Sequence, residues 1–252
     1  MISMEELRQI KEKRRTTLYY AEKEYLQYVF LHAISRFSEN FVFKGGTCLR
    51  ICYDFERASE DLDFNTNLGL QETKKTVKTC LKNFELLNIE HTVFAEKEFE
   101  GNIRFEARFK GPLYNGQNSS TNTLKIDFNK SKAKGKTAKA IPKLFSDIPV
   151  FTIQALSLEE MLTEKIRALI NRGEARDLYD VWMLLQNKIA INKKLLKQKL
   201  SEEKSNYPKT KFPTKEEYET SLKNLLEHLP AYEQIKKEVK QKLDKTMQKP
   251  NN

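Results

Sequence analysis

The segment FVFKGGTCLRICYDFERASEDLDF, residues 41–64, limits the fold more than any other part of the chain. FVFK is short, mostly aromatic or β-branched, and stops at two glycines, which is typical of a strand that ends in a turn. TCLRICY then fits a helix with Thr47 near its N-terminus, and DLDFN fits a second short strand. The segment therefore predicts a strand, a turn, a helix and a strand in that order.

The rest of the chain predicts helices around a small sheet, followed by helices alone. Apolar residues three and four apart indicate two amphipathic helices before the segment and one after it. Further strands are expected over residues 89–94, 103–109 and 123–128. Beyond them we expect helices over residues 158–171, 174–186, 193–205, 215–227 and 232–247. The pattern predicts an α+β protein with a mixed-sheet domain over residues 1–148, which includes the N-terminal helices, and an α-helical domain over residues 149–252.

Composition favours a soluble globular protein. Hydrophobic residues make up 39% of the chain and charged residues 32%. The amphipathic N-terminus has no signal-peptide core, and no apolar run reaches the roughly 20 residues that a membrane span needs. Three cysteines without C-x-x-C spacing argue against a disulfide framework and against a zinc site. We expect a cytoplasmic protein that does not bind membranes.

The net charge of +10 favours polyanionic partners. Six lysines and no acid lie between Asn129 and Ser146, in what we expect to be a flexible basic loop. From Lys188 to the C-terminus there are sixteen lysines against nine acids. These runs fit either a solvated surface or contact with nucleic acid.

Asp61 and Asp63 are the first candidate catalytic residues. Residues two apart on a strand point to the same face, so the two carboxylates repel each other unless a cation lies between them. Mg²⁺ (or Mn²⁺) prefers oxygen ligands and supplies that charge. Asp127 in KIDFN is a third acid on a predicted strand, and it is a candidate metal ligand or a strand aspartate that faces solvent.

Gly45, Gly46 and Thr47 are candidate phosphate-binding residues. Glycines let backbone N–H groups approach a phosphate at a helix N-terminus, and the threonine hydroxyl adds a donor. Alone, G-G-T is more common as a simple turn and D-x-D as a solvated strand end. Their combination is more informative than either.

The combination G-G-[S/T], a gap of 13 residues and D-x-D resembles the nucleotidyltransferase superfamily related to DNA polymerase β. The fuller wording is similar to the AbiEii abortive-infection toxins, the toxin half of type IV toxin–antitoxin systems. Lys44, Arg50, Arg57, Ser59 and Glu60 stand where that wording has them. The resemblance implies that Lys44, Gly45, Gly46 and Thr47 bind nucleotide and that Asp61 and Asp63 bind metal.

The resemblance continues in TEKIRALINRGEARDLYDVWMLL, residues 163–185. A helical lysine followed by R-D-x-x-D matches later motifs of that family. It marks Lys165 and Asp180 as catalytic residues and Lys165, Arg176 and Asp177 as nucleotide-binding residues. A salt-bridge network between helices is the structural alternative for the same side chains.

The resemblance implies a metal-dependent nucleotidyltransferase that moves NMP from an NTP to an acceptor and releases pyrophosphate. It implies a toxin with a cognate antitoxin encoded nearby and an RNA acceptor such as the tRNA 3′ end. Two alternatives stay open: a nucleotidyltransferase that acts on a small molecule, and a nucleotide- or RNA-binding protein without turnover.

Overall fold

The structure is a computed structural model that describes residues 1–131, 133–203 and 210–248. Its contacts divide the chain into two compact units, Met1–Leu156 and Ser157–Asn252. The predicted division after residue 148 falls before the last strand of the sheet. That strand belongs with the first unit because it pairs with two other strands there.

A mixed sheet forms the first unit. The described residues contribute seven strands to it, in the spatial order β3-β4-β5-β2-β1-β7-β6. Their bounds are β1 Phe41–Lys44, β2 Leu62–Thr66, β3 His91–Phe99, β4 Asn102–Phe109, β5 Asn122–Asn129, β6 Lys136–Ile141 and β7 Phe151–Leu156. The β1/β7 and β2/β5 pairs are parallel and the other pairs are antiparallel, so the predicted mixed sheet and α+β fold are confirmed.

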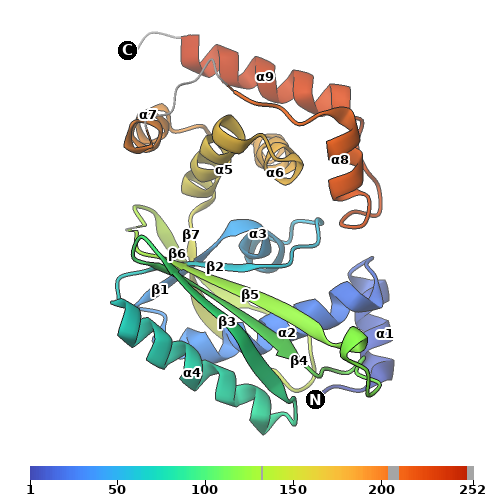
Figure 1. The fold of residues 1–252 in the computed structure, drawn as a ribbon. Helices are drawn as coiled ribbons and strands as arrows, with labels where there is room; N and C mark the ends of the chain where they lie inside the picture. The colour runs from blue at the N-terminus through green and yellow to red at the C-terminus, as the bar shows by residue number, and fades with distance from the viewer. Residues whose placement is uncertain (132, 204–209, 249–252) are drawn as a thin grey trace. The chain divides into compact units, whose positions relative to one another are not determined.

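The first unit contains α1 Met4–Lys13, α2 Leu18–Ile34, α3 Gly45–Tyr53 and α4 Leu70–Leu86, with short 3₁₀ turns η1 Ser35–Phe37 and η2 Asn118–Ser120. Helices α2 and α4 run along one side of this sheet, whereas α3 lies apart from them beside β2 (Figure 1). Thr17 caps α2 by accepting the N–H of Tyr20 at 3.3 Å. Most of α2 is buried, including its polar residues Glu22, Lys23, Glu24 and Gln27. An amphipathic helix would leave such residues in solvent, so their burial needs a specific cause, which the site supplies.

A row of aromatic side chains forms the centre of the core. Phe43, Phe64 and Phe128 are in register on β1, β2 and β5, and all three are buried. The rings of Phe64 and Phe128 stack with centroids 5.2 Å apart, and Phe30 of α2 contacts Phe64. Because side chains alternate along a strand, the residues next to these phenylalanines point to the opposite face of the sheet.

The second unit is helical. Its described elements are α5 Leu158–Arg172, α6 Ala175–Gln186, α7 Lys193–Glu202, α8 Lys215–Leu222 and α9 Tyr232–Gln248. Ser157 accepts the N–H of Glu160 at 3.4 Å and starts α5, as the sequence predicts. The apolar stripes of α5 and α6 supply its core through Leu162, Ile166, Leu169, Leu178 and Val181, all buried.

Three sequence expectations differ from the structure. The predicted flexible basic loop is wrong over Lys136–Ile141, because these residues form β6 and pair with β7. Helix α8 ends at Leu222, before the predicted residue 227, and the chain then turns so that the Tyr218 hydroxyl donates to the Pro230 carbonyl at 3.0 Å. Helix α7 ends at Glu202, and the predicted continuation through Lys204 and Ser205 lies outside the described residues.

No helix within the described ranges is long and apolar enough to cross a membrane.

Candidate functional site

The glycine turn after β1 packs directly against the D-x-D pair. Gly45 has φ +79°, a left-handed backbone that favours glycine. A Cβ added to Gly45 would lie 2.3 Å from Asp63 Oδ2, and one added to Gly46 would lie 2.4 Å from Arg57 Nη2. Both positions are therefore closed to side chains, and the Asp63 carboxylate lies at the start of α3.

Residues 56–61, here called the acidic loop, lead into β2. Side chains from α2, from α3 and from the loop itself hold the backbone carbonyls of the loop. Arg50 donates to the Glu56 carbonyl at 2.5 Å, and Arg57 donates to the Ala58 carbonyl at 2.9 Å. The Gln27 amide donates to the carbonyls of Ser59 at 3.0 Å and Glu60 at 3.1 Å. The Thr47 hydroxyl donates to the Asp61 carbonyl at 2.5 Å. Gln27 and Thr47 are fully buried. The hydrogen bonds fix the backbone on which Asp61 is carried.

The hydroxyl of Thr47 has a role different from the predicted one in this structure. It donates its hydrogen to the Asp61 carbonyl, so that hydrogen is directed at the protein backbone. A hydroxyl has one hydrogen to donate. Thr47 therefore links the glycine turn to the D-x-D pair in this conformation.

A buried ion cluster supports the acidic loop from behind. Glu24 of α2 accepts hydrogen bonds from Arg50 Nε at 3.0 Å and forms an ion pair with Arg14 Nη2 at 2.7 Å. The side chains of Glu24 and Arg50 are 2% and 4% exposed. Removing one member of a buried pair typically costs 3–5 kcal/mol, because the other charge stays buried without compensation. Arg50 is thus held in the position from which it reaches Glu56.

Charged residues form a row across the sheet on the face opposite the aromatic core. In register, Lys44 pairs with Asp63, Asp63 with Asp127, Asp127 with Arg104, and Arg104 with Lys97. Residues directly opposite each other on neighbouring strands point to the same face. The structure thereby brings Lys44, Asp63 and Asp127 to one face of the sheet, and it adds Arg104 to them.

Asp127 is engaged by Arg104. The guanidinium donates to Asp127 Oδ1 at 2.7 Å and to Oδ2 at 3.0 Å, the two-point geometry that guanidinium and carboxylate favour. The hydrogen bond to Asp127 also holds the pKa of Arg104 above its usual value. Arg104 therefore occupies one lone pair on each Asp127 oxygen and competes with a metal for this carboxylate.

The carboxylates fit a Mg²⁺ site with two protein ligands but not a preformed site with three. Across the described part of the chain, no group of three or more His, Cys, Asp or Glu side chains is arranged to hold a metal ion. Mg²⁺ commonly uses one or two carboxylates and completes its shell with phosphates and water. Asp61 and Asp63 fit a Mg²⁺ site of this kind, with two carboxylates. The residues that the structure describes do not form a preformed site in which Asp127 is the third carboxylate.

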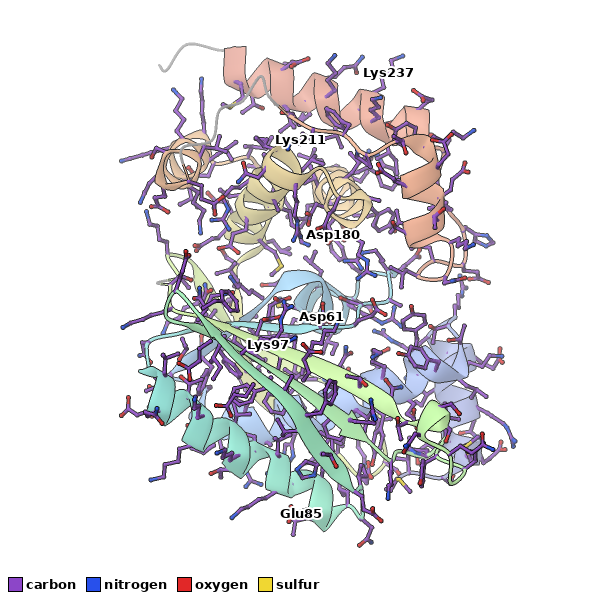
Figure 2. The ribbon with its side chains drawn as sticks, in the orientation of Figure 1. Asp61, Glu85, Lys97, Asp180, Lys211 and Lys237 are labelled. Atoms are coloured by element: carbon purple, nitrogen blue, oxygen red, sulfur yellow. The ribbon has the colours of Figure 1, made fainter. Side chains whose placement is uncertain are left out.

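A buried lysine lies near the acids. Lys23 is 4% exposed and donates to the Thr123 carbonyl at 2.6 Å. Burial lowers the pKa of Lys23, while the negative charges of Glu60 and Asp61 oppose that shift. Figure 2 marks Asp61 beside α3 in this unit. Lys23 adds positive charge where the D-x-D carboxylates concentrate negative charge.

In the second unit, the predicted residues Lys165, Asp177 and Asp180 are in contact. Lys165 Nζ lies 2.9 Å from Asp177 Oδ1 and 2.9 Å from Asp180 Oδ2. Both aspartates are buried, and Arg172 Nε also contacts Asp177 at 2.7 Å. The sequence alternative of a salt-bridge network between α5 and α6 is therefore present in the geometry. The same contacts would fix the lysine ammonium in one position.

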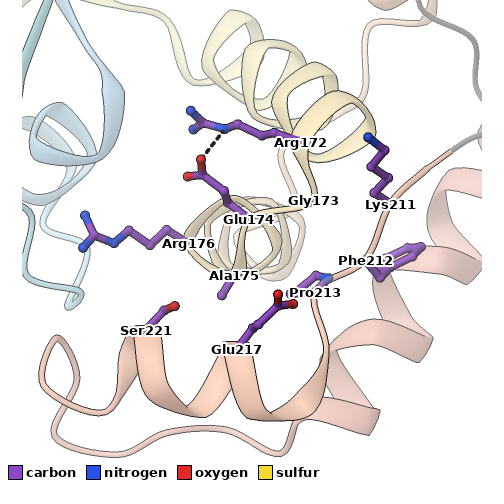
Figure 3. A pocket seen from close by; sticks show the side chains of 10 residues that line it. All are labelled: Arg172, Gly173, Glu174, Ala175, Arg176, Lys211, Phe212, Pro213, Glu217 and Ser221. Atoms are coloured by element: carbon purple, nitrogen blue, oxygen red, sulfur yellow. Dashed lines mark ion pairs between the residues drawn. The ribbon is translucent and has the colours of Figure 1, made fainter.

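Arg176, the remaining predicted residue, lines a pocket of about 610 Å³ at the start of α6. Arg172, Glu174 and Lys211 also line it (Figure 3). Arg172 forms an ion pair with Glu174 at 3.4 Å. Through Arg172, this pocket is connected to the Lys165–Asp177–Asp180 cluster within the second unit.

Comparison with protein families decides the identity of the chain. The family model described as nucleotidyl transferase AbiEii toxin, type IV TA system, matches residues 29–250. The chain belongs to the AbiEii family. It is accordingly a nucleotidyltransferase toxin of the type IV toxin–antitoxin class.

Two solved structures share the fold of this chain. MenT4, a nucleotidyltransferase toxin from Mycobacterium tuberculosis, superposes with a TM-score of 0.71 at 16% identity, covering 97% of this chain and 90% of that chain. JHP933 from Helicobacter pylori superposes with a TM-score of 0.60 at 19% identity, covering 92% and 96%. At these identities the likeness concerns the fold. A search of curated proteins gives no match.

Several residues around the site were missed by the sequence prediction. Lys23, Glu24 and Gln27 lie on a helix that the apolar stripe predicts, but a helical pattern places its polar residues in solvent. Arg104 lies on a strand that was predicted correctly. Its partner Asp127 is a predicted site residue. The pairing of the two side chains follows from the register of β4 and β5, which the sequence does not give.

Substitution of Gly45 by alanine tests the contact between the glycine turn and Asp63. Gly101 has φ +78° and no atom within 4 Å of an added Cβ, so Gly101→Ala carries the same backbone cost, about 1–2 kcal/mol. We expect Gly45→Ala to lower the free energy of unfolding by a further 1–3 kcal/mol, roughly, because the methyl group displaces the Asp63 carboxylate. Urea unfolding followed by circular dichroism measures the difference. Equal stability of the two variants would contradict the packing.

Substitution of Lys165 by methionine tests the cluster in the second unit. It leaves Asp177 and Asp180 buried with less positive charge, so we expect the second unit to lose about 3–5 kcal/mol of stability. Trp182, the single tryptophan, lies on α6 with both aspartates and reports unfolding by fluorescence. Lys194→Met, at an exposed position of α7, is the matched control. A loss of stability no larger than that of Lys194→Met would show that the cluster does not stabilise the second unit.

Proposed function

We propose that the chain transfers NMP from an NTP to an RNA acceptor, such as the 3′ end of tRNA, and releases pyrophosphate. The observation that supports this most is the contact between the glycine turn and the D-x-D pair: the Gly45 backbone lies against Asp63, and Thr47 bonds the Asp61 carbonyl. Phosphate binding and metal binding are then neighbours, as transfer from a triphosphate requires.

In this proposal the residues of the first unit hold the triphosphate. The backbone at Gly45 and Gly46, where no side chain fits, lets phosphate oxygens approach the N-terminus of α3. Lys44, in register with Asp63, adds positive charge beside them. Asp61 and Asp63 would hold Mg²⁺ or Mn²⁺, which when bound neutralises charge on the transferring phosphoryl group. Catalysis rests on positioning and charge neutralisation.

Asp127 and the second unit complete the proposed assignment. Asp127 becomes a third ligand, or a base for the acceptor hydroxyl, when Arg104 releases it. Within the second unit, Lys165 and Arg176 bind nucleotide phosphate, and Asp177 and Asp180 fix the position of the Lys165 ammonium. The support for these roles is the family motif and, for Lys165, its contacts with both aspartates.

The acceptor and the partner are proposed from charge and from the family. A net charge of +10 attracts a polyanion, and exposed lysines follow the described helix α9 at Lys237, Lys240, Lys242 and Lys245. Figure 2 marks Lys237 on this helix. Type IV toxin–antitoxin membership supports a cognate antitoxin encoded nearby as the protein partner.

Incubation with each α-labelled NTP, Mg²⁺ and total RNA tests the transfer. We expect the label to enter RNA and to fall by at least about 100-fold in Asp63→Asn, because loss of a group that stabilises developing charge commonly costs 10²–10³ in rate. Glu85→Gln, at an exposed position of α4, is the matched control because it also replaces a carboxylate by an amide but lies away from the D-x-D pair. Chelation of the metal by EDTA should abolish labelling.

The other outcomes separate the alternatives. Label on a low-mass product instead of RNA would replace the RNA acceptor by a small molecule. Binding of NTP without incorporation into any product would contradict transfer and favour a binding protein.

A further inference from the structure

The outward face of β3, β4 and β5, here called the open sheet face, carries charged and aromatic side chains beside the candidate site. On β4, Ile103, Phe105, Ala107 and Phe109 are buried, whereas the residues between them point the other way. The outward side chains are Phe94 and Lys97 on β3, Arg104, Glu106 and Arg108 on β4, and Thr123 and Lys125 on β5.

Two cations on this face are available to a ligand. Lys97 Nζ pairs with Glu106 at 2.8 Å, and Arg104 pairs with Asp127. Lys125 and Arg108 are exposed, and neither has a carboxylate oxygen within 4 Å among the residues that the structure describes. In the strand register Lys125 is opposite Glu106, and Arg108 is opposite Thr123, one pleat further along. The face therefore offers two positive charges at neighbouring positions.

Phe94 adds an aromatic surface next to these cations. Its side chain is 49% exposed on the edge strand β3, at the irregularity between Val93 and Ala95 where the register shifts. The guanidinium of Arg108 lies 5.2 Å from the centre of its ring. A bulge of this kind re-aims a side chain, and here it brings the ring onto the same face as Arg108.

The open sheet face is continuous with the D-x-D pair. Lys125 precedes Asp127 by two residues on β5, so the two side chains share a face and lie roughly 7 Å apart along the strand. Asp127 is in turn in register with Asp63. A polyanion that lies over Lys125 and Arg108 therefore has one end close to the carboxylates proposed to hold the metal.

We propose that the open sheet face binds an unpaired segment of the RNA acceptor next to its reacting end. A base stacks on Phe94, and backbone phosphates contact Arg108 and Lys125. Unpaired bases stack on exposed aromatic side chains, whereas a duplex hides them, so the combination of ring and cations fits a single strand. This inference rests on the proposed function, because it names the surface that holds its acceptor.

Equilibrium binding of a short, fluorescently labelled single-stranded RNA, without NTP, tests the proposal. We expect Phe94→Ala to weaken binding by roughly tenfold, as loss of one base-stacking partner does. We expect the Arg108→Ala/Lys125→Ala double variant to reduce the slope of log K against log salt by about 0.7 for each cation removed. Circular dichroism checks that the variants are folded.

Helix α4 supplies the matched controls. Leu86→Ala removes an apolar side chain that is 80% exposed, and Lys75→Ala/Lys78→Ala removes two exposed lysines from that helix. They change composition and net charge as the test variants do, but away from the open sheet face. We expect RNA affinity within about twofold of the unmodified chain for Leu86→Ala. For the double control we expect an unchanged salt slope.

The outcomes distinguish this inference from the proposed function. If RNA binding is unchanged in the test variants and the unmodified chain transfers label to RNA, the proposal that the open sheet face binds RNA is wrong and the proposed transfer stands. If the test variants bind RNA more weakly and the unmodified chain transfers label to no acceptor, the open sheet face binds RNA and the proposed transfer is wrong. If the variants lose binding to a protein partner but keep RNA affinity, the face belongs to that partner and the proposal is overturned.

Discussion

The site depends on hydrogen bonds that side chains of the first unit, most of them buried, donate to the backbone carbonyls of the acidic loop. Loops usually lie in water because their backbone groups need partners, and four consecutive carbonyls, from Ala58 to Asp61, obtain them here from Arg57, Gln27 and Thr47. The Gln27 amide presents its nitrogen to Ser59 and Glu60, and among the residues that the structure describes its buried oxygen has no hydrogen-bond partner. A buried unpaired oxygen typically costs about 1–3 kcal/mol, so the orientation of this loop is maintained against an opposing free energy.

Strand register transmits that orientation across the sheet. Once the loop enters β2 at Leu62, the alternation of side chains places Leu62 and Phe64 in the core and Asp63 on the other face. A slip of one residue would bury Asp63 and expose Phe64, and the stacked row of phenylalanines makes such a slip unfavourable. The aromatic core thus fixes the register that places Lys44 and Asp127 on either side of Asp63 on the charged face.

Sequence reasoning recovered the local chemistry well and the long-range pairing poorly. The strand, helix and strand over residues 41–64 are confirmed because Thr47 and the alternating DLDF pattern act within a few residues, but the helix begins directly at Gly45 and not after a separate turn. The pairing of Arg104 with Asp127 depends on how β4 and β5 align, and one sequence does not state that register. Likewise, the buried Glu24 and Gln27 resemble solvent-facing helix residues until the acidic loop is packed on them. Strand β6 was missed because its lysines suggested a loop, although alternating alanine and lysine also suits an edge strand.

The central claim is that the glycine turn and the D-x-D pair form one nucleotide–metal site, oriented by the acidic loop. Diffraction from crystals grown with Mn²⁺ and a non-hydrolysable NTP tests it most directly, since the anomalous signal locates the metal. The account predicts a metal bound to oxygens of both Asp61 and Asp63, about 2.1 Å away as for Mg²⁺, with triphosphate oxygens against the backbone of Gly45 and Gly46. A metal bound to other acids, or a triphosphate remote from the glycine turn, would contradict the account.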